Sequence, residues 1–447
     1  MASLEQQLGY RQELRRTLTL RDLVVYGMVF MVPISPFGVF GFVSKDAKGM
    51  VPLAYLVGLV GMFFTAMSYA SMSRAFPMAG SVYTYVGRGL HEIAGFFAGW
   101  LILLDYILVP ALLYVFSAVA LQPLLPGVPE WAWILGFVSF NAVVNLRGIH
   151  LTARVNLGML ALEITTLALF VVIGLLALYH GAGAGALTLK PVYDPAVFSM
   201  ATIAGATSIA VLSFLGFDGI STLAEESLGG GGSVARATLA SLLVVGGLFI
   251  LQTWIAADLA QGTRLSSPDT AFYEIAARAG GGPLRLLVIV TNILATGIAN
   301  ALVAQAAVSR ILYAMARDGK LPAALARVHP RFRTPHVSTL LVAGISVAVG
   351  ILCANHLDDL TRVVNLGALS GFLLLHAAVI HHYVIRGRSR AWLTHLVMPL
   401  AGLAVIGYVL YEMDRAAKIL GAIWIALGFV YFAVHTLILK KPAAIEL

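Results

Sequence analysis

Long apolar segments recur along the whole chain, and short polar segments separate them. A helix needs roughly 17–25 apolar residues to cross the hydrocarbon core of a bilayer. Polar turns, such as residues 45–49 and 268–269, give the backbone access to water between these segments. The pattern predicts an all-α polytopic membrane protein with about 12 transmembrane helices, at approximately residues 20–43, 51–73, 93–121, 131–146, 155–180, 199–224, 237–260, 284–307, 337–354, 363–385, 392–411 and 419–439.

The amino-acid composition supports a protein that is embedded in a lipid bilayer. Of its 447 residues, 60% are hydrophobic and 11% are charged, whereas about a quarter of a soluble domain is charged. The formal net charge of +8 is spread over short loops and does not form one basic face. The expected partners are therefore the lipid bilayer and a small molecule, with no nucleic acid.

Motifs for common catalytic and metal sites are absent from the sequence. The single cysteine, Cys353, excludes intrachain disulfides and cysteine-ligated metals. The pair His381 and His382 has no third ligand at metal spacing, and neither Gly-x-Ser-x-Gly nor His-Glu-x-x-His occurs. We expect no enzymatic activity, no cofactor and no metal.

The distribution of basic residues predicts the orientation in the membrane. With twelve crossings and the N-terminus inside, 20 of the 29 Lys and Arg residues fall on the inner side and 9 on the outer side. Basic residues are enriched on the cytoplasmic side of membrane proteins. Both terminal segments, 1–19 and 440–447, are therefore expected in the cytoplasm, and no signal-peptide cleavage site follows the first apolar run.

Two of the predicted crossings contain residues that interrupt a helix. Pro33 and Pro36 lie within the first crossing, and Gly216, Asp218 and Gly219 lie within the sixth. These crossings are the first members of two five-helix halves, and transporters with inverted repeats unwind at such matched positions to bind substrate. The alternative is a pair of ordinary kinks, because Pro and Gly are common in membrane helices.

Three acidic residues fall within predicted crossings: Asp105, Glu163 and Asp218. An ionisable group in the membrane is costly, so each is a functional candidate. A carboxyl group in a low-dielectric medium can exchange a proton near physiological pH, as proton-coupled transport requires. Glu163 is the best candidate for this role. The alternative is a protonated carboxyl group that hydrogen-bonds to a neighbouring helix.

An acidic pair and a glycine run follow the sixth crossing. Glu225 and Glu226 are expected at the cytoplasmic boundary, where they either hold a gate closed or are solvated. Residues 229–233 read Gly-Gly-Gly-Gly-Ser, without the Lys-Ser/Thr that a phosphate-binding loop needs. We interpret this run as a flexible loop.

Three motifs occur in order along the chain: FPMAGSVYTY at 76–85, SFLGFD at 213–218 leading to the acidic pair, and SRILYAMARDGKLP at 309–322. With them the sequence resembles the amino acid-polyamine-organocation permease superfamily, in the branch of bacterial putrescine importers and cationic amino acid transporters. The resemblance implies a LeuT-type fold in the inner membrane. Ten core helices would form two inverted five-helix repeats, at about 20–180 and 199–385, and two peripheral helices would occupy 386–439.

The resemblance also implies a substrate site at the two breaks. Exposed backbone in helix one would bind a substrate carboxylate or amine, and helix six would complete the site with an aromatic gate, Phe214 or Phe217. The candidate substrate-binding residues are Val32, Pro33, Ile34, Ser35, Gly38, Tyr106, Leu212, Ser213, Phe214, Leu215 and Phe217.

The sequence departs from the family pattern at two positions that concern the substrate. Residues 33–36 read Pro-Ile-Ser-Pro where many members carry a Gly-Ser-Gly type segment, which favours substrates without an α-carboxylate. Gly38 replaces an acidic residue of the putrescine-importer branch, which argues against a long diamine.

A third departure concerns the driving ion. Glu163 falls where cationic amino acid transporter relatives carry a lysine implicated in proton coupling. A glutamate can carry the proton or pair with a substrate ammonium, whereas a lysine would repel that ammonium.

These features predict a secondary active transporter that imports a small amine, polyamine or amino acid by alternating access, coupled to protons. Exchange of one substrate for another is the alternative. A channel or a transporter-like sensor fits less well, because neither a ring of polar pore residues nor a soluble signalling domain is visible.

Overall fold

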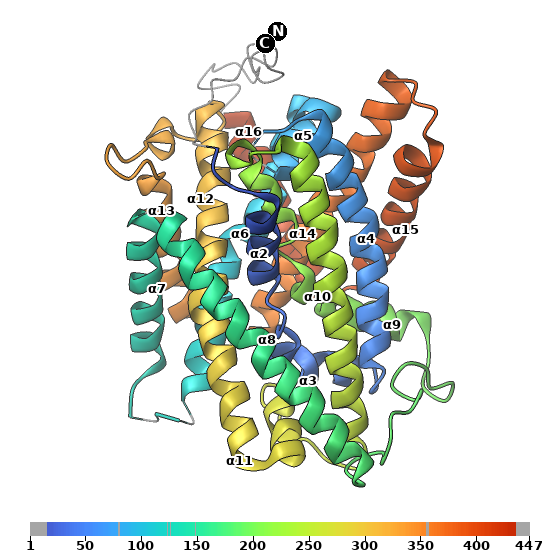
Figure 1. Cartoon of the computed structure of the whole chain (residues 1–447). Helices are drawn as coiled ribbons and strands as arrows, with labels where there is room; N and C mark the ends of the chain where they lie inside the picture. Colours follow the sequence, from blue (N-terminus) through green and yellow to red (C-terminus); the bar gives the residue numbers. More distant parts are fainter. Residues whose placement is uncertain are drawn as a thin grey trace.

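A computed structural model describes residues 16–78, 81–122, 124–125, 127–147, 149–354 and 357–434. The secondary structure in this part of the chain is helical (Figure 1). The helices are α2 (Leu20–Met31), α3 (Pro36–Asp46), α4 (Val51–Ala75), α5 (Ser81–Gly89), α6 (Glu92–Leu121), α7 (Glu130–Arg147), α8 (Ile149–Tyr179), α9 (Met200–Ala210), η1 (Val211–Phe214), η2 (Asp218–Glu226), α10 (Gly230–Ala260), α11 (Ala271–Leu294), η3 (Ala295–Asn300), α12 (Ala301–Arg317), η4 (Ala323–Ala326), α13 (His336–Leu352), α14 (Leu357–Val379), η5 (Ile380–Arg386), η6 (Leu393–Val397), α15 (Met398–Glu412) and α16 (Arg415–Ala433).

The length and apolarity of these helices identify a multi-pass membrane protein. Within the described residues, nine helical segments can cross a bilayer, and the pair α2 and α3, bent by 51°, makes a tenth. Helices α7 and α13 occupy the other two predicted positions, but α13 is only 17 residues long. The all-α membrane architecture is therefore confirmed, while the number of twelve crossings and the inverted repeat stay predictions.

Helix α2 lies in the centre of the bundle, between α10 and α12 in the view of Figure 1. It packs directly against α8 and α10, and α10 packs along α4. By contrast, the rest of the bundle covers little of α15 and α16. Within the apolar 18-residue stretch of each helix, 22% (α15) and 17% (α16) is buried, compared with 67% for α6. Apolar side chains that no other helix covers can face lipid, so these two helices lie at the edge of the bundle.

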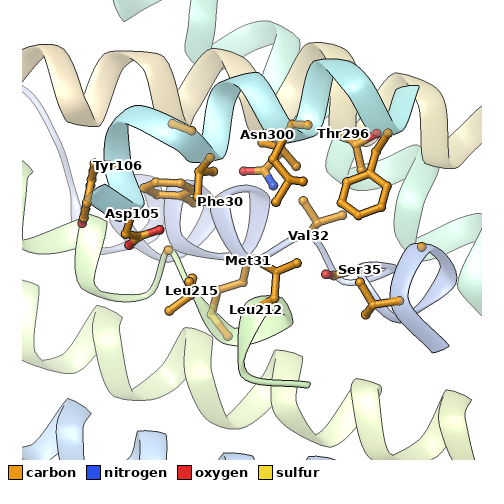
Figure 2. A pocket seen from close by; sticks show the side chains of 18 of the residues that line it. Phe30, Met31, Val32, Ser35, Asp105, Tyr106, Leu212, Leu215, Thr296 and Asn300 are labelled. Atoms are coloured by element: carbon orange, nitrogen blue, oxygen red, sulfur yellow. The ribbon is translucent and has the colours of Figure 1, made fainter. Parts of the chain in front are cut away.

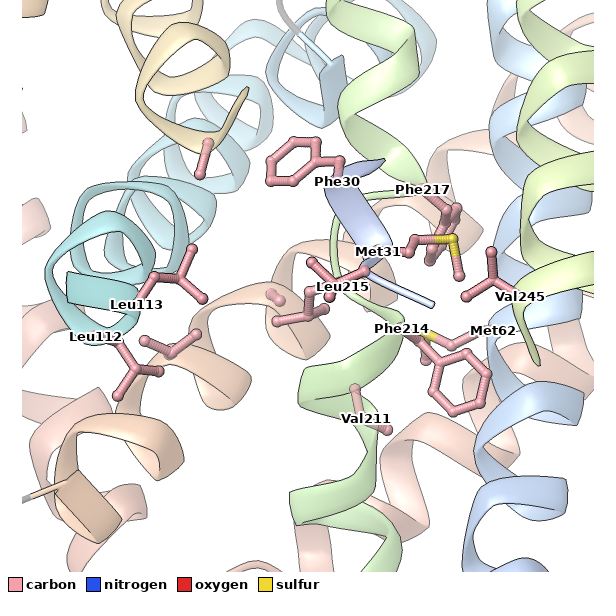
Figure 3. Close-up of a cluster of buried hydrophobic side chains, with 14 of the residues drawn as sticks. Phe30, Met31, Met62, Leu112, Leu113, Val211, Phe214, Leu215, Phe217 and Val245 are labelled. Atoms are coloured by element: carbon pink, nitrogen blue, oxygen red, sulfur yellow. The ribbon is translucent and has the colours of Figure 1, made fainter. Parts of the chain in front are cut away.

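Apolar side chains close the bundle around the two helix breaks (Figure 3). Phe214 is buried against Tyr55 of α4 and Phe249 of α10, with ring centroids 5.9 and 5.2 Å away. Phe217 packs against Tyr69 of α4 and a phenyl ring of α14. These contacts hold the interrupted helix against α4, α10 and α14.

The helix that follows the loop at 261–270 is interrupted twice, which the sequence pattern did not predict. Gly280 and Gly281 break α11, and Gly281 has φ +67°, a conformation that other residues rarely adopt. The π-helical segment η3 then separates α11 from α12. Asn141 of α7 donates to the carbonyl of Gly297 at 2.9 Å, so a side chain of a neighbouring helix satisfies a backbone group in this irregular segment.

Candidate substrate site

The first helix break separates α2 from α3 at residues 32–35. Val32 ends α2 with φ +51°, a conformation that is unfavourable for a β-branched residue. Proline residues at 33 and 36 remove two backbone donors. Gln252 of α10 donates to the Pro33 carbonyl at 2.8 Å, so a neighbouring helix satisfies a backbone acceptor that the break exposes.

The second break separates η1 from η2 at residues 215–217. Gly216 has φ +115°, and a Cβ atom there would lie 2.8–2.9 Å from Phe30 of α2. The carboxylate of Asp218 accepts a hydrogen bond from the Gly216 amide at 3.2 Å, at the N-terminus of η2. Only glycine allows the two broken helices to approach this closely.

A cavity of about 60 Å³ lies between the two breaks (Figure 2). A single water needs roughly 10–15 Å³ on this scale, so the cavity has the dimensions of a small-molecule site. Side chains from α2, α3, α6, η1 and the segment from α11 to α12 form its wall. The lining residues are Phe30, Met31, Val32, Ser35, Gly38, Val39, Asp105, Tyr106, Val109, Leu112, Leu113, Phe116, Leu212, Leu215, Gly216, Asp218, Asn292, Thr296, Asn300 and Ala304.

Two acidic residues, Asp105 and Asp218, line this cavity, and Asp218 is beside Tyr106. Asp218 accepts the hydroxyl of Tyr106 as well as the Gly216 amide. The Oδ1 atom of Asp105 is buried and has no hydrogen-bond partner within the described ranges. Two carboxyl groups in one small cavity favour a bound proton or cation there.

Neutral polar groups line the cavity away from the carboxylates. Thr296 and Asn300 are four residues apart on η3. Figure 2 shows Thr296 and Ser35 on the side away from Asp105, with Asn300 between them and Asp105. Asn292 lies one turn before Thr296, whose hydroxyl donates to the Asn292 carbonyl. The residues that line the cavity include no lysine, arginine or histidine.

A larger cavity of about 350 Å³ adjoins the first at the α3 end. Gly38, Phe116 and Asn292 line both cavities, so they form the boundary between them. Asp269 and Arg285 line the larger cavity. A small molecule that entered here would reach the inner cavity past Asn292.

At the end of the bundle opposite to this larger cavity, ion pairs join the end of η2 to α12. Arg310 of α12 pairs with Glu226 at 3.0 Å, and Arg317 pairs with Glu225 at 3.6 Å. The backbone amide of Leu18 donates to the Glu226 carbonyl, which ties the start of the described chain to the same place. The acidic pair thus forms ion pairs with α12 in the described structure.

The structure brings together six of the eleven candidate substrate-binding residues as cavity lining: Val32, Ser35, Gly38, Tyr106, Leu212 and Leu215. The other five do not line it: Pro33, Ile34, Ser213, Phe214 and Phe217. Ser213 hydrogen-bonds to Tyr55, and the two phenylalanines pack into the bundle instead of facing the cavity. Phe30 and Phe116 are the phenyl rings that line it.

The candidate proton-coupling residues lie in two places. Asp105 and Asp218 line the cavity. Glu163 is buried on α8, 1% exposed, and does not line it. Among the described residues, neither carboxyl oxygen of Glu163 has a hydrogen-bond partner, so the alternative of a structural hydrogen bond to a neighbouring helix is not observed there.

The sequence interpretation missed the polar residues of the α11–η3 segment. Asn292, Thr296 and Asn300 recur every four residues within an apolar segment, which places them on one helix face. This four-residue spacing is the sequence signal that could have identified them as candidate site residues.

A multi-pass helical membrane protein with two interrupted helices around a small cavity that contains a few polar groups has the architecture of a secondary transporter. The model of the amino acid permease family matches residues 23–442, and the chain belongs to this family.

Three curated relatives indicate what such proteins carry. The chain is 32% identical to the low-affinity putrescine importer PlaP of Escherichia coli, over 97% of this chain and 96% of the importer. It is 26% identical to the branched-chain amino acid permease BcaP of Bacillus subtilis, over 95% and 94% of the two chains. It is 27% identical to the mouse cationic amino acid transporter 4, over 82% of this chain and 60% of that protein. The protein is a secondary transporter of amines or amino acids.

Proposed function

We propose that this transporter imports its substrate by alternating access through the cavity between the two broken helices, in symport with protons. The observation that supports this most strongly is the position of the cavity, between breaks in both α2–α3 and η1–η2. An open cavity at the α3 end and ion pairs at the η2 end fit a protein that opens to one side at a time.

In this proposal the protein lies in the inner membrane of the cell, and its η2 end faces the cytoplasm. The excess of basic residues on that side and the prediction of cytoplasmic termini support this orientation. An inside-negative potential favours entry of a cation by about 2.3 kcal/mol per charge per 100 mV. A cationic amine would therefore move inward even with little further driving force.

Glu163 is the proposed proton carrier, because its carboxyl oxygens are buried and lack hydrogen-bond partners in the described structure. Glutamine has nearly the same shape as glutamate, but its side chain cannot bind and release a proton. We expect Glu163→Gln protein in proteoliposomes to lose the stimulation of uptake by an inward pH gradient, with substrate binding retained. Glu412→Gln, at the end of the peripheral helix α15, is the matched control.

Exchange is the competing mechanism, and the same vesicles distinguish it. Uptake that is unaffected by the pH gradient but requires substrate inside the vesicles would contradict symport. Unchanged pH dependence in Glu163→Gln protein would remove this residue from coupling.

A further inference from the structure

The cavity between the helix breaks has a donor and acceptor pattern that identifies its ligand more closely. A carboxylate ligand needs hydrogen-bond donors, which the ends of broken helices usually supply through free backbone amides. An ammonium ligand needs acceptors. The two requirements can be compared with the groups that this chain presents.

The start of α3 offers few free donors. Pro36, the first residue of the helix, has no amide hydrogen. The amides of Ser35, Phe37 and Gly38 already donate to the carbonyls of residues 32, 34 and 35, at 2.8, 2.9 and 3.2 Å. A carboxylate placed here would have to displace these turn bonds.

The start of η2 already carries a carboxylate of the protein itself. The Asp218 side chain accepts the Gly216 amide, and the Gly219 amide donates to the Gly216 carbonyl at 3.0 Å. A second carboxylate at this helix end would be repelled by Asp218. At both helix breaks, turn hydrogen bonds or the Asp218 carboxylate thus engage most of the amides that could hold a ligand carboxylate.

Acceptors, by contrast, are left without partners in the part of the chain that the structure describes. There, Asp105 Oδ1, Asn292 Oδ1 and Asn300 Oδ1 are buried and unpartnered, and all three residues line the cavity. A buried polar atom without a partner costs about 1–3 kcal/mol, so a ligand that donates to these atoms recovers that cost.

We infer that the cavity selects carboxylate-free primary amines, and that Asp105 is the residue that binds the ligand ammonium. The unpartnered oxygens of Asn292 and Asn300 then accept from a second donor group of the ligand. This inference rests on the proposed function and makes it more specific: amines are substrates, and the corresponding α-amino acids are excluded.

Two pairs of probes that differ by one carboxylate test the inference: isopentylamine with leucine, and putrescine with ornithine. Affinities are measured by thermal shift of the purified full-length protein, and uptake is measured in proteoliposomes. Each amine is expected to bind at least about tenfold more tightly than its amino acid, because the amino acid brings a carboxylate next to Asp218.

Asp105→Asn should weaken amine binding at least about tenfold, since it removes the charge that pairs with the ammonium. Asp105→Glu keeps the charge and should retain amine binding above the level of Asp105→Asn. Asp414→Asn, at the exposed N-cap of α16, should leave binding unchanged, because asparagine caps a helix as well as aspartate does. Without ligand, Asp105→Asn should melt no lower than the wild type, because it removes a buried unpartnered carboxylate.

Leucine or ornithine binding as tightly as its amine would overturn the inference, and so would wild-type amine affinity in Asp105→Asn. Uptake of leucine without uptake of isopentylamine would overturn it while leaving the transport function intact. Uptake of none of the four probes would count against the proposed function itself.

Discussion

Replacing Arg310 with alanine should open the protein at the η2 end. The Arg310 guanidinium donates to Glu226 at 3.0 Å, and the two side chains are only 15% and 9% exposed. Without the guanidinium, the Glu226 carboxylate has no counter-ion in the closed protein. In a state that is open at this end, water would hydrate the same carboxylate. The substitution therefore destabilises the closed state relative to the open one.

The size of this shift follows from the burial of the ion pair. Removing one partner of a fully buried pair costs about 3–5 kcal/mol. Both side chains keep some contact with solvent, so we expect a smaller cost of about 2 kcal/mol. A change of 1.4 kcal/mol corresponds to a factor of ten, so the open population should rise about 30-fold.

A buried reporter next to the ion pair can measure this change. Thr222 is fully buried on η2, so Thr222→Cys in a Cys353→Ala background reacts with a maleimide only when this end opens. In lipid nanodiscs, Arg310→Ala should label about 10–30 times faster than the parent. Arg236→Ala removes an exposed arginine of α10 and is the control. Adding Glu226→Gln to Arg310→Ala should slow labelling again, because no charge is then left unpaired.

An unchanged labelling rate in the arginine variant would refute the reasoning, as would an equal increase in the α10 control. The melting temperature of each sample distinguishes opening of one end from loss of the fold. Faster labelling that results from unfolding would be accompanied by a lower melting temperature, whereas faster labelling that results from opening of the η2 end would not.

The remaining predictions concern the two helix breaks. Gly216→Ala should lower the free energy of unfolding by about 2–4 kcal/mol, because its φ is +115° and the new Cβ would overlap the backbone of Phe30. Gly247→Ala, at an open position on α10, should instead stabilise by up to about 1 kcal/mol, and thermal melting compares the two. Gln252→Leu should cost about 1–3 kcal/mol by leaving the Pro33 carbonyl without its side-chain donor, and an unchanged melting temperature would contradict that role.

The helix breaks were predictable from the sequence because their causes are local. Pro33 and Pro36 remove backbone donors at fixed positions, and Gly216 permits a positive φ. The all-α membrane architecture was predictable for a similar reason, since apolar length alone determines it. The residues that cause a helix break lie in the break, and the residues that make a helix long and apolar lie in that helix.

The composition of the cavity wall was less predictable, because it depends on contacts between distant segments. Phe214 and Phe217 lie beside the break, yet α4, α10 and α14 bury them away from the cavity. Asn300 lines the cavity from η3, a π-helical segment that the sequence pattern did not predict. Neither the partner helices nor the π-helical turn leaves a strong local signal in the sequence.

A structure determined with bound isopentylamine would test the central claim most directly. We predict ligand density in the cavity between α2–α3 and η1–η2, with the ammonium nitrogen within hydrogen-bond distance of the Asp105 carboxylate. Density for the amine at another place in the bundle, with this cavity empty, would contradict the account.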